Sequence, residues 1–254
     1  KNAFIEQLGT TVAAKRTSRH SDTPRLDVPH ARRRVSLVDY DWADLIDQED
    51  KIRMLIDPTG PYTEQAAFAL GRAMDDEIIA AADGTAFTGV DGSTSTSFTS
   101  GNIVDVQVGG SSADVGLNVA KLRAAKEVLD SSDVAPEIER YCVLNATQLK
   151  NLLGETAVTS SDFNTVKALV QGELDTFLGF NFIRTQRIGV DSNSDDKVLF
   201  YAKPGIALAV GQDVQVRISE RADKNYSQQV FASMSIGATR LQEELVGYIE
   251  CDPS

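Results

Sequence analysis

The first 34 residues constrain the fold most, because they cannot form a hydrophobic core of their own. Their larger apolar residues are few and are separated by Thr, Ser, Arg and Pro; they are Phe4, Ile5, Leu8, Val12, Leu26 and Val28. A segment of this composition buries too little apolar surface to offset the entropy of ordering its chain. We therefore predict an extended hairpin, with limbs near residues 4–14 and 30–38, that is ordered only by pairing with other structure.

The charge of this opening segment is opposite to that of the rest of the chain. It has eight Lys and Arg against three acidic residues, a net +5, while the whole chain carries −12, which leaves −17 for residues 35–254. The basic segment either binds DNA or contacts the acidic surface of a neighbouring copy. We favour the neighbouring copy, because the chain supplies that acidic surface and its overall charge opposes coating of nucleic acid.

A long helix is predicted from Tyr62 to Gly84. Pro and Gly break the chain just before it, and Gly84 is placed as the C-cap. Apolar residues recur three or four apart, as one helix face requires; they are Ala67, Leu70, Met74, Ile78 and Ala81. Charged residues occupy the opposite face. This segment is the element around which we expect the remaining structure to be arranged.

The rest of the chain predicts an α+β protein with a mostly antiparallel C-terminal third. Residues 85–102 have the composition of a flexible loop or an exposed hairpin. Helices are expected at 113–130 (capped by Ser112 or Asp114), at 146–153 (capped by Asn145) and from Ser161 or Asp162 to 170. Strands are expected at 103–108, 140–144, 180–185, 198–202, 206–210, 214–218, 228–236 and 245–251, with a kink at 237–240.

Two acidic stretches resemble metal sites only superficially. Residues 40–50 contain Asp41, Asp44, Asp47, Glu49 and Asp50. No His lies nearby and the spacing suits no metal, so we interpret them as the charged face of a short turn or helix, with Trp42 anchoring the segment. Residues 190–197 begin like a calcium loop, but Asp196 stands where that loop needs Gly and Ala202 where it needs Glu. A surface turn is the better interpretation.

No active site is recognisable, so we predict no catalytic, cofactor-binding or metal-binding residues. The nucleophile, phosphate-loop and zinc motifs are absent, and only two His are present. Cys142 and Cys251 are expected to be buried free thiols unless the fold brings them together. No apolar run reaches the ~18 residues of a membrane span. The chain starts at Lys1 without a signal-peptide pattern, and we expect further residues before it.

The order of these segments resembles the major capsid proteins of tailed bacteriophages, which have the Hong Kong 97-type capsid fold. The resemblance is strongest over residues 27–92, in the arginine triplet, DYDWADLID, IDPT and GRAMDDEIIAA. It continues through RYCVLNATQLKNLL, LGFNFIRT and SMSIGATRLQEELVGYIECDP and so covers nearly the whole chain. It implies an extended loop at 1–40, a peripheral domain at 41–130 with its spine helix at 62–84, an axial domain at 131–224, and closing peripheral strands at 225–254.

The resemblance also implies a function without enzyme activity or cofactor. The chain would assemble into hexamers and pentamers of an icosahedral shell, in the bacterial host cytoplasm, and would enclose double-stranded DNA in the virion without sequence specificity or a membrane. Scaffold, portal and decoration proteins are further partners that it leaves open. An encapsulin-like nanocompartment shell, which shares the fold but encloses enzyme cargo, is the alternative. An enzyme or nucleotide-binding protein with an unrecognised site is a third hypothesis.

The predicted contacts between subunits join the basic segment to the acidic stretch. The basic members are Lys15, Arg16, Arg19, Arg32, Arg33 and Arg34; the acidic members are Asp41, Asp44, Asp47, Glu49 and Asp50 of another copy. Our specific hypothesis places the arginine triplet against that acidic region, so that reversing all three charges blocks assembly while the subunit still folds. Lys15 also lies in the loop where some members of the resembled family form Lys–Asn isopeptide bonds.

Overall fold

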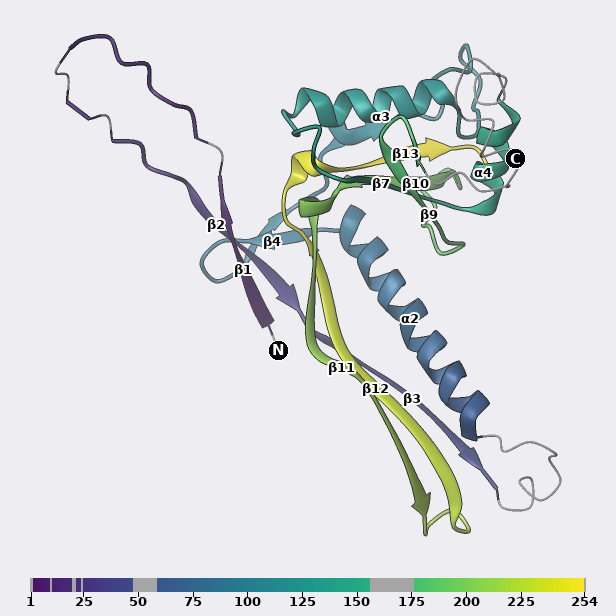
Figure 1. Cartoon of the computed structure of the whole chain (residues 1–254). Helices are drawn as coiled ribbons and strands as arrows, with labels where there is room; N and C mark the ends of the chain where they lie inside the picture. The colour runs from purple at the N-terminus through teal and green to yellow at the C-terminus, as the bar shows by residue number, and fades with distance from the viewer. Residues whose placement is uncertain are drawn as a thin grey trace.

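The computed structural model describes residues 2–9, 11–19, 22–23, 25–47, 59–155 and 176–253. Three parts are visible in Figure 1: a hairpin arm that projects away from the rest, a long narrow sheet with a helix along it, and a compact mixed sheet that carries two helices. Each part contains its own sheet, in which the described residues form four, three and six strands respectively.

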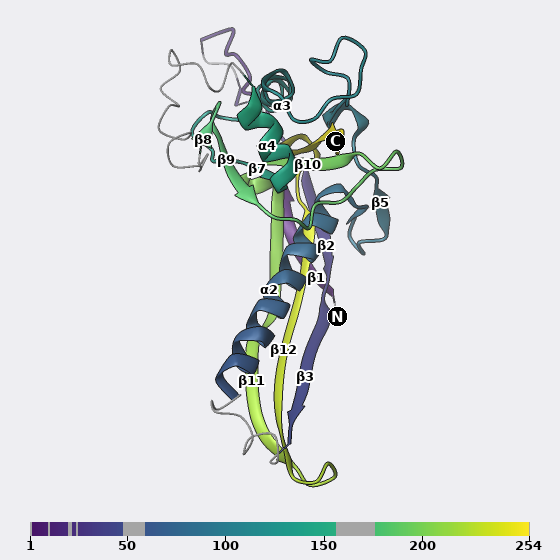
Figure 2. The same cartoon turned by 90° about the vertical axis from the view of Figure 1, so that its right-hand side faces the viewer.

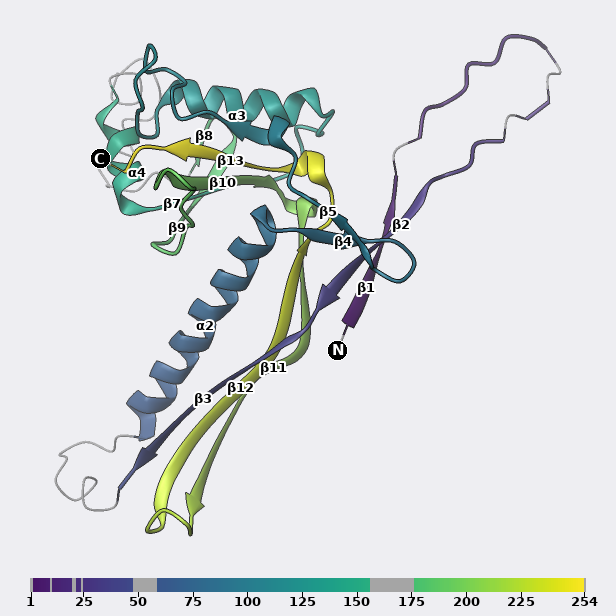
Figure 3. The same ribbon diagram turned by 180° about the vertical axis from the view of Figure 1, so that it is seen from behind.

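The arm confirms the predicted pairing of the opening segment. β1 (Asn2–Leu8) runs antiparallel to β2 (His30–Ser36), with Asn2 opposite Ser36 and Leu8 opposite His30. The described residues between these strands form no strand and extend the arm outward (Figure 3). At its base, β2 pairs with β4 (Ala86–Thr88), and β4 pairs with β5 (Thr94–Thr96). Residues 85–102 therefore contain the exposed hairpin that their composition allowed.

The long sheet has the order β11–β12–β3. Its strands are β3 (Val38–Ile46), β11 (Ile206–Arg221) and β12 (Ser227–Arg240). Helix α2 (Thr59–Asp83) lies along one face of it, as Figure 2 shows. The core between them contains Ala66, Leu70, Ala232, Met234 and Ile236, with Tyr40, Trp42, Ala73 and Met74 packed against it. The predicted anchoring role of Trp42 is confirmed.

The predicted face of α2 needs one correction. Ala66 is buried and Ala67 is exposed, because the helix packs on the sheet through Ala66, Leu70, Ala73 and Met74. At the other end, the amide of Gly84 donates to the carbonyl of Ala80 (3.0 Å), which completes the last turn as a C-cap should.

The six-stranded sheet has the order β6–β13–β10–β7–β9–β8. Its strands are β6 (Ile103–Val104), β7 (Arg140–Leu144), β8 (Thr176–Phe177), β9 (Phe180–Arg184), β10 (Asp196–Ala202) and β13 (Val246–Cys251). Helices α3 (Val119–Ser131) and α4 (Ala146–Gly154) cover it. The largest apolar core of the described residues lies between this sheet and the two helices. Three short 3₁₀ turns, Ser100–Asn102, Lys203–Gly205 and Glu243–Leu245, connect strands.

Of the two helix starts predicted in this part, one is confirmed and one is wrong. Asn145 accepts the amide of Gln148 (2.8 Å), so the predicted start of α4 is confirmed. The predicted start of α3 near residue 113 is wrong, because Asn118 is its N-cap and accepts the amide of Lys121 (2.8 Å). The preceding residues form turns, with Ser111 and Ser112 at φ values of 50° and 77° that a helix does not allow.

Strand boundaries also differ from the predictions. β6 ends at Val104, because the carboxylate of Asp105 accepts the amide of Gln107 and turns the chain. The strands predicted at 206–210 and 214–218 are one strand, β11, with irregular register between them. β12 passes through 237–240 without the predicted break, since it stays paired with β11 up to Arg240. The helix predicted to end at 170 lies outside the described residues.

The sheets divide the chain differently from the expected domain ranges. β11 falls within 131–224 but belongs to the long sheet, and β13 falls within 225–254 but belongs to the six-stranded sheet. Hydrogen bonding between strands distant in sequence, rather than sequence order, sets this division. The two parts meet at a small core that contains Ala82 at the end of α2 with Val143, Leu199 and Val246.

Candidate assembly surfaces

The outer part of the arm is a basic, fully exposed segment. Every residue from 11 to 19 is exposed, including Lys15, Arg16 and Arg19. One hydrogen bond from these side chains stays within the arm itself: Arg16 Nε donates to the carbonyl of Ser18 (3.1 Å). Within the described residues, none of the three forms an ion pair with the Asp residues of β3. Their charges are therefore available to another molecule.

The arginine triplet is divided among three environments, because neighbouring residues of a strand point to opposite faces. Arg32 forms a half-exposed ion pair with Glu6 across the hairpin (3.1 Å). Arg33 is buried and donates to the carbonyl of Leu241 (3.0 Å) and to Glu243 (2.9 Å). Arg34 lies over the ring of Phe87, 4.4 Å from its centroid.

Arg33 belongs to a buried ionic cluster where the arm, the long sheet and α2 meet. Glu243 pairs with Arg33 through one oxygen and with Arg240 through the other (2.5 Å). Arg240 is fully buried and also donates to the carbonyls of Ala82 and Gly84, both at 2.8 Å, which lie at the end of α2. This cluster ties three separate elements together, and it was not visible in the sequence.

Positive charge exceeds negative charge in this cluster. Nη1 of Arg33 and Nη2 of Arg240 are buried without a hydrogen-bond partner within the described residues. Removing the carboxylate, or reversing Arg33 to Glu beside it, would leave buried charge uncompensated. Reversing the whole triplet would thus disrupt the subunit itself and cannot isolate an effect on assembly.

The acidic stretch is a strand, not the short turn or helix that we expected, because it pairs with β12 over nine residues. The chain carries no Lys or Arg from Val35 to Asp47. Since Tyr40 and Trp42 point toward α2, Asp39 and Asp41 point to the opposite face and Asp44 to the helix face. The predicted acidic residues therefore do not share one face.

Asp39 and Asp41 lie on a polar groove on the face away from α2. The groove has a volume of ≈ 350 Å³, and its lining is Leu37, Asp39, Asp41, Gly211, Gln212, Ser233, Met234 and Ser235. The hydroxyl of Ser233 accepts from Gln212 (3.0 Å). Asp47 instead accepts the hydroxyl of Ser227 (2.5 Å). Glu49 and Asp50 lie outside the described residues, and Asp39 was missed by the sequence prediction.

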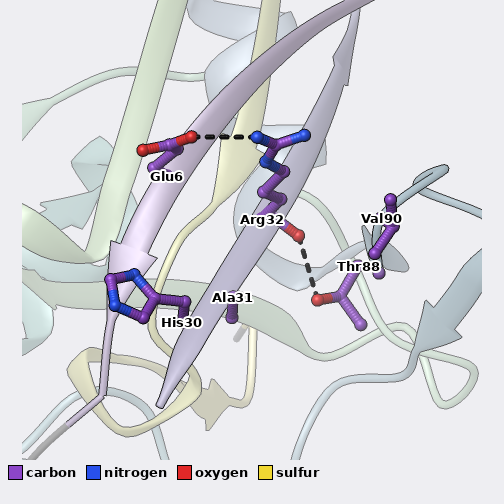
Figure 4. Close-up of a pocket in the computed structure, with 7 residues that line it drawn as sticks. Glu6, His30, Ala31, Arg32, Thr88 and Val90 are labelled. Atoms are coloured by element: carbon purple, nitrogen blue, oxygen red, sulfur yellow. Dashed lines mark hydrogen bonds and ion pairs between the residues drawn. The ribbon is translucent and has the colours of Figure 1, made fainter. Parts of the chain in front are cut away.

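A second cavity lies at the base of the arm (Figure 4). Its volume is ≈ 500 Å³, and its lining is Glu6, His30, Ala31, Arg32, Thr88, Gly89 and Val90. The hydroxyl of Thr88 donates to the carbonyl of Arg32 (3.0 Å), and Arg32 is paired with Glu6. The polar groups here thus hold β1, β2 and β4 together, and no lining residue forms a nucleophile–base pair.

The possible calcium loop is closed by its own backbone. One oxygen of Asp191 accepts the amides of Asn193 and Asp195, both at 2.8 Å, as in a tight turn. Asp196 is buried and accepts from Asn145 (2.7 Å) and Gln148 (2.9 Å), so it is a structural acceptor. In the part of the chain that the structure describes, no three His, Cys, Asp or Glu side chains are placed to hold a metal ion.

Both cysteines are free and buried, as predicted. Burial raises the pKa of the Cys142 thiol and raises the pKa of Cys251 to about 12, so neither is a reactive thiolate near neutral pH. Among the described helices, none combines the length and apolar character needed to cross a membrane.

A family model and solved structures both relate this chain to phage capsid proteins. A family model described as phage capsid protein matches residues 1–253. The capsid structure of the cyanophage P-SCSP1u is similar at 18% identity and a TM-score of 0.72, covering 100% of this chain and 84% of that one. The head structure of Helicobacter pylori bacteriophage KHP40 is similar at 10% identity and a TM-score of 0.73, covering 100% and 86%. At these identities the structures show a shared fold. No curated protein matches the sequence.

Proposed function

The chain belongs to the phage capsid protein family and is a structural, non-enzymatic subunit of a phage shell, and from this premise we propose how its parts build that shell. The predicted α+β fold of the Hong Kong 97 type is confirmed by the similar capsid structures. The encapsulin-like alternative is not favoured, because the matching family is one of phage capsids.

The arm is the observation that supports the assembly proposal. It is basic, exposed along residues 11–19 and without a core of its own. In a closed shell, each such contact is repeated by symmetry, so that individually weak ion pairs together set register and partner choice. The arm would act as the extended loop, α2 with the long sheet as the peripheral domain, and the six-stranded sheet with α3 and α4 as the axial domain.

The contact that we propose joins the outer arm of one subunit to the polar groove of its neighbour. Lys15, Arg16 and Arg19 supply free positive charge, and Asp39 and Asp41 supply negative charge on one face. Arg33 and Arg34 are held within their own subunit, and Asp47 is bound by Ser227. Arg32, Asp44, Glu49 and Asp50 remain predicted members at the margin of this contact.

A charge-swap experiment tests the contact. Arg16→Glu with Arg19→Glu should abolish shells in electron micrographs while the thermal unfolding midpoint of the subunit stays unchanged, since both side chains are exposed. Adding Asp39→Lys and Asp41→Lys should restore assembly if the two surfaces meet. Normal shells from the first variant, or no recovery in the second, would exclude the pairing.

The further partners follow from assembly and charge. Copies would group into hexamers and pentamers, and the enclosed genome would be double-stranded DNA. The net charge of −12 suits a container whose wall must not bind DNA during packaging. Scaffold, portal and decoration proteins, and assembly in the bacterial host cytoplasm, belong to the same proposal. Nuclease-protected DNA in purified particles is the measurement that tests the cargo.

A further inference from the structure

Among the strands that the structure describes, β3 and β11 form the two unpaired edges of the long sheet, and these edges differ in chemistry. β3 forms one edge and carries three Asp without a basic residue, whereas β11 forms the other and carries Asp213 and Glu220 against Arg217 and Arg221. A basic arm is attracted to the first edge and gains nothing at the second. The edge of β11, with two acidic and two basic residues, therefore suits a partner strand that also carries no net charge.

β11 also exposes a row of apolar side chains. Leu208, Val210, Val214, Val216 and Ile218 are 37% to 52% exposed. Val216 and Ile218 stand opposite the buried residues Ala232 and Val230 of β12, so they lie on the face that α2 covers farther along the sheet. A contiguous exposed apolar row on an edge strand is a typical interaction site.

Only the second half of this edge is regular. Register shifts fall between Val210 and Gln212 and between Gln212 and Gln215, and such bulges disfavour pairing with another strand. From Gln215 to Arg221, each residue pairs with β12 without a shift. These seven residues present an unbroken set of outward backbone donors and acceptors.

We infer that this segment pairs with the same segment of a second copy across a two-fold axis of the shell. The inference rests on the proposed shell assembly. Two identical strands that pair antiparallel and continue one sheet are related by a two-fold axis perpendicular to that sheet. Both α2 helices then lie on the same side of the sheet, which agrees with subunits that all turn the same side inward. An antiparallel pair of this kind places one residue opposite itself, and using the whole regular segment makes that residue Ile218.

This register keeps like charges from facing each other. It places Gln215 opposite Arg221 of the partner subunit, Val216 opposite Glu220 of the partner subunit, and Arg217 opposite Ser219 of the partner subunit. Registers centred on Arg217 or Ser219 would instead bring arginines face to face, which is unfavourable. The Arg221 charge is already paired with Asp223 of its own copy (2.8 Å). Ile218 meets its own copy and extends the apolar row.

Cross-linking of assembled particles tests the pairing. Directly opposite residues have Cβ atoms about 4.5–5.5 Å apart, close to disulfide geometry. Ile218→Cys particles, mildly oxidised, should therefore give subunit dimers on a non-reducing gel. Val210→Cys is the matched control, because it is as exposed but lies in the bulged half, and should stay monomeric. The native thiols are buried and give no background.

A second variant separates this inference from shell assembly as such. Ile218→Arg places two positive charges on the axis and should reduce the yield of particles at least tenfold, with an unchanged unfolding midpoint. Particles at wild-type yield from Ile218→Arg, or equal dimers from both cysteine variants, would overturn the pairing while leaving shell assembly intact. Absence of particles from the unmodified protein would count against the proposed function itself.

Discussion

At the scale of single residues, Glu243 has the largest expected effect. Its side chain bridges Arg33 and Arg240, whose side chains are 8% and 0% exposed. Glu243→Gln should destabilise the subunit by about 3–5 kcal/mol, because it leaves two buried guanidinium charges without a counter-charge. Urea unfolding measures the change, with the exposed neighbour substitution Glu244→Gln as the control. Equal unfolding midpoints for the two variants would show that the cluster contributes little.

Asp195 provides a test that depends on pH. Burial, and then repulsion from Asp191, Asp114 and Asp252, raises the pKa of its carboxyl, while Lys121 opposes the rise. The folded state thus binds a proton more tightly than the unfolded state. Above the raised pKa, the charged carboxylate therefore lowers the stability of the folded state. This cost disappears as the pH falls toward the pKa that Asp195 has in the unfolded state. Asp195→Asn should therefore be slightly more stable than the wild type at pH 7.

The pH dependence distinguishes this explanation from a general effect of the substitution. The difference in thermal unfolding midpoint between Asp195→Asn and the wild type should narrow steadily as the buffer is made more acidic. A difference that stays constant from pH 7 to pH 4 would contradict the assigned cause.

At the scale of elements, the long sheet depends on helix α2 for its core. Leu70 is 3% exposed between helix and sheet, whereas Phe68, two residues earlier, is 60% exposed. Leu70→Ala should destabilise the subunit by about 2–5 kcal/mol through lost burial and a cavity. Phe68→Ala should change stability by no more than about 0.5 kcal/mol, as is usual at the surface. The reverse order in denaturant titration would refute the packing described for α2.

At the scale of the whole molecule, the outer arm should be dispensable for folding and essential for assembly. Gly9 donates to the carbonyl of Pro29 (2.8 Å), which continues the hairpin beyond β1 and β2. Replacing residues 10–28 by Asn-Gly provides the two-residue turn that such a hairpin favours. Circular dichroism should show an unchanged fold, and electron microscopy should show no shells. Normal shells from this variant would contradict the role of the arm.

Much of this organisation follows from local rules that the sequence states directly. The sparse apolar residues of the opening segment predicted a hairpin without a core, and the apolar spacing from Leu70 to Met74 predicted α2. Asn145 predicted the start of α4 because its side chain can bond an amide only three residues away. The absence of nucleophile and metal motifs pointed to a function carried by surfaces. Each of these inferences depends on neighbours within a few residues.

Only the tertiary structure decided which charges are free to bind another molecule. Arg33 and Glu243 are 210 residues apart in the chain, yet they form a buried pair, while Arg16 stays exposed. The strand character of residues 38–46 separated Asp41 from Asp44, and the pairing of β11 with β12 created the open apolar edge. The energy of a charge or an edge is set by whatever lies within a few ångströms of it, and sequence order does not specify that neighbourhood.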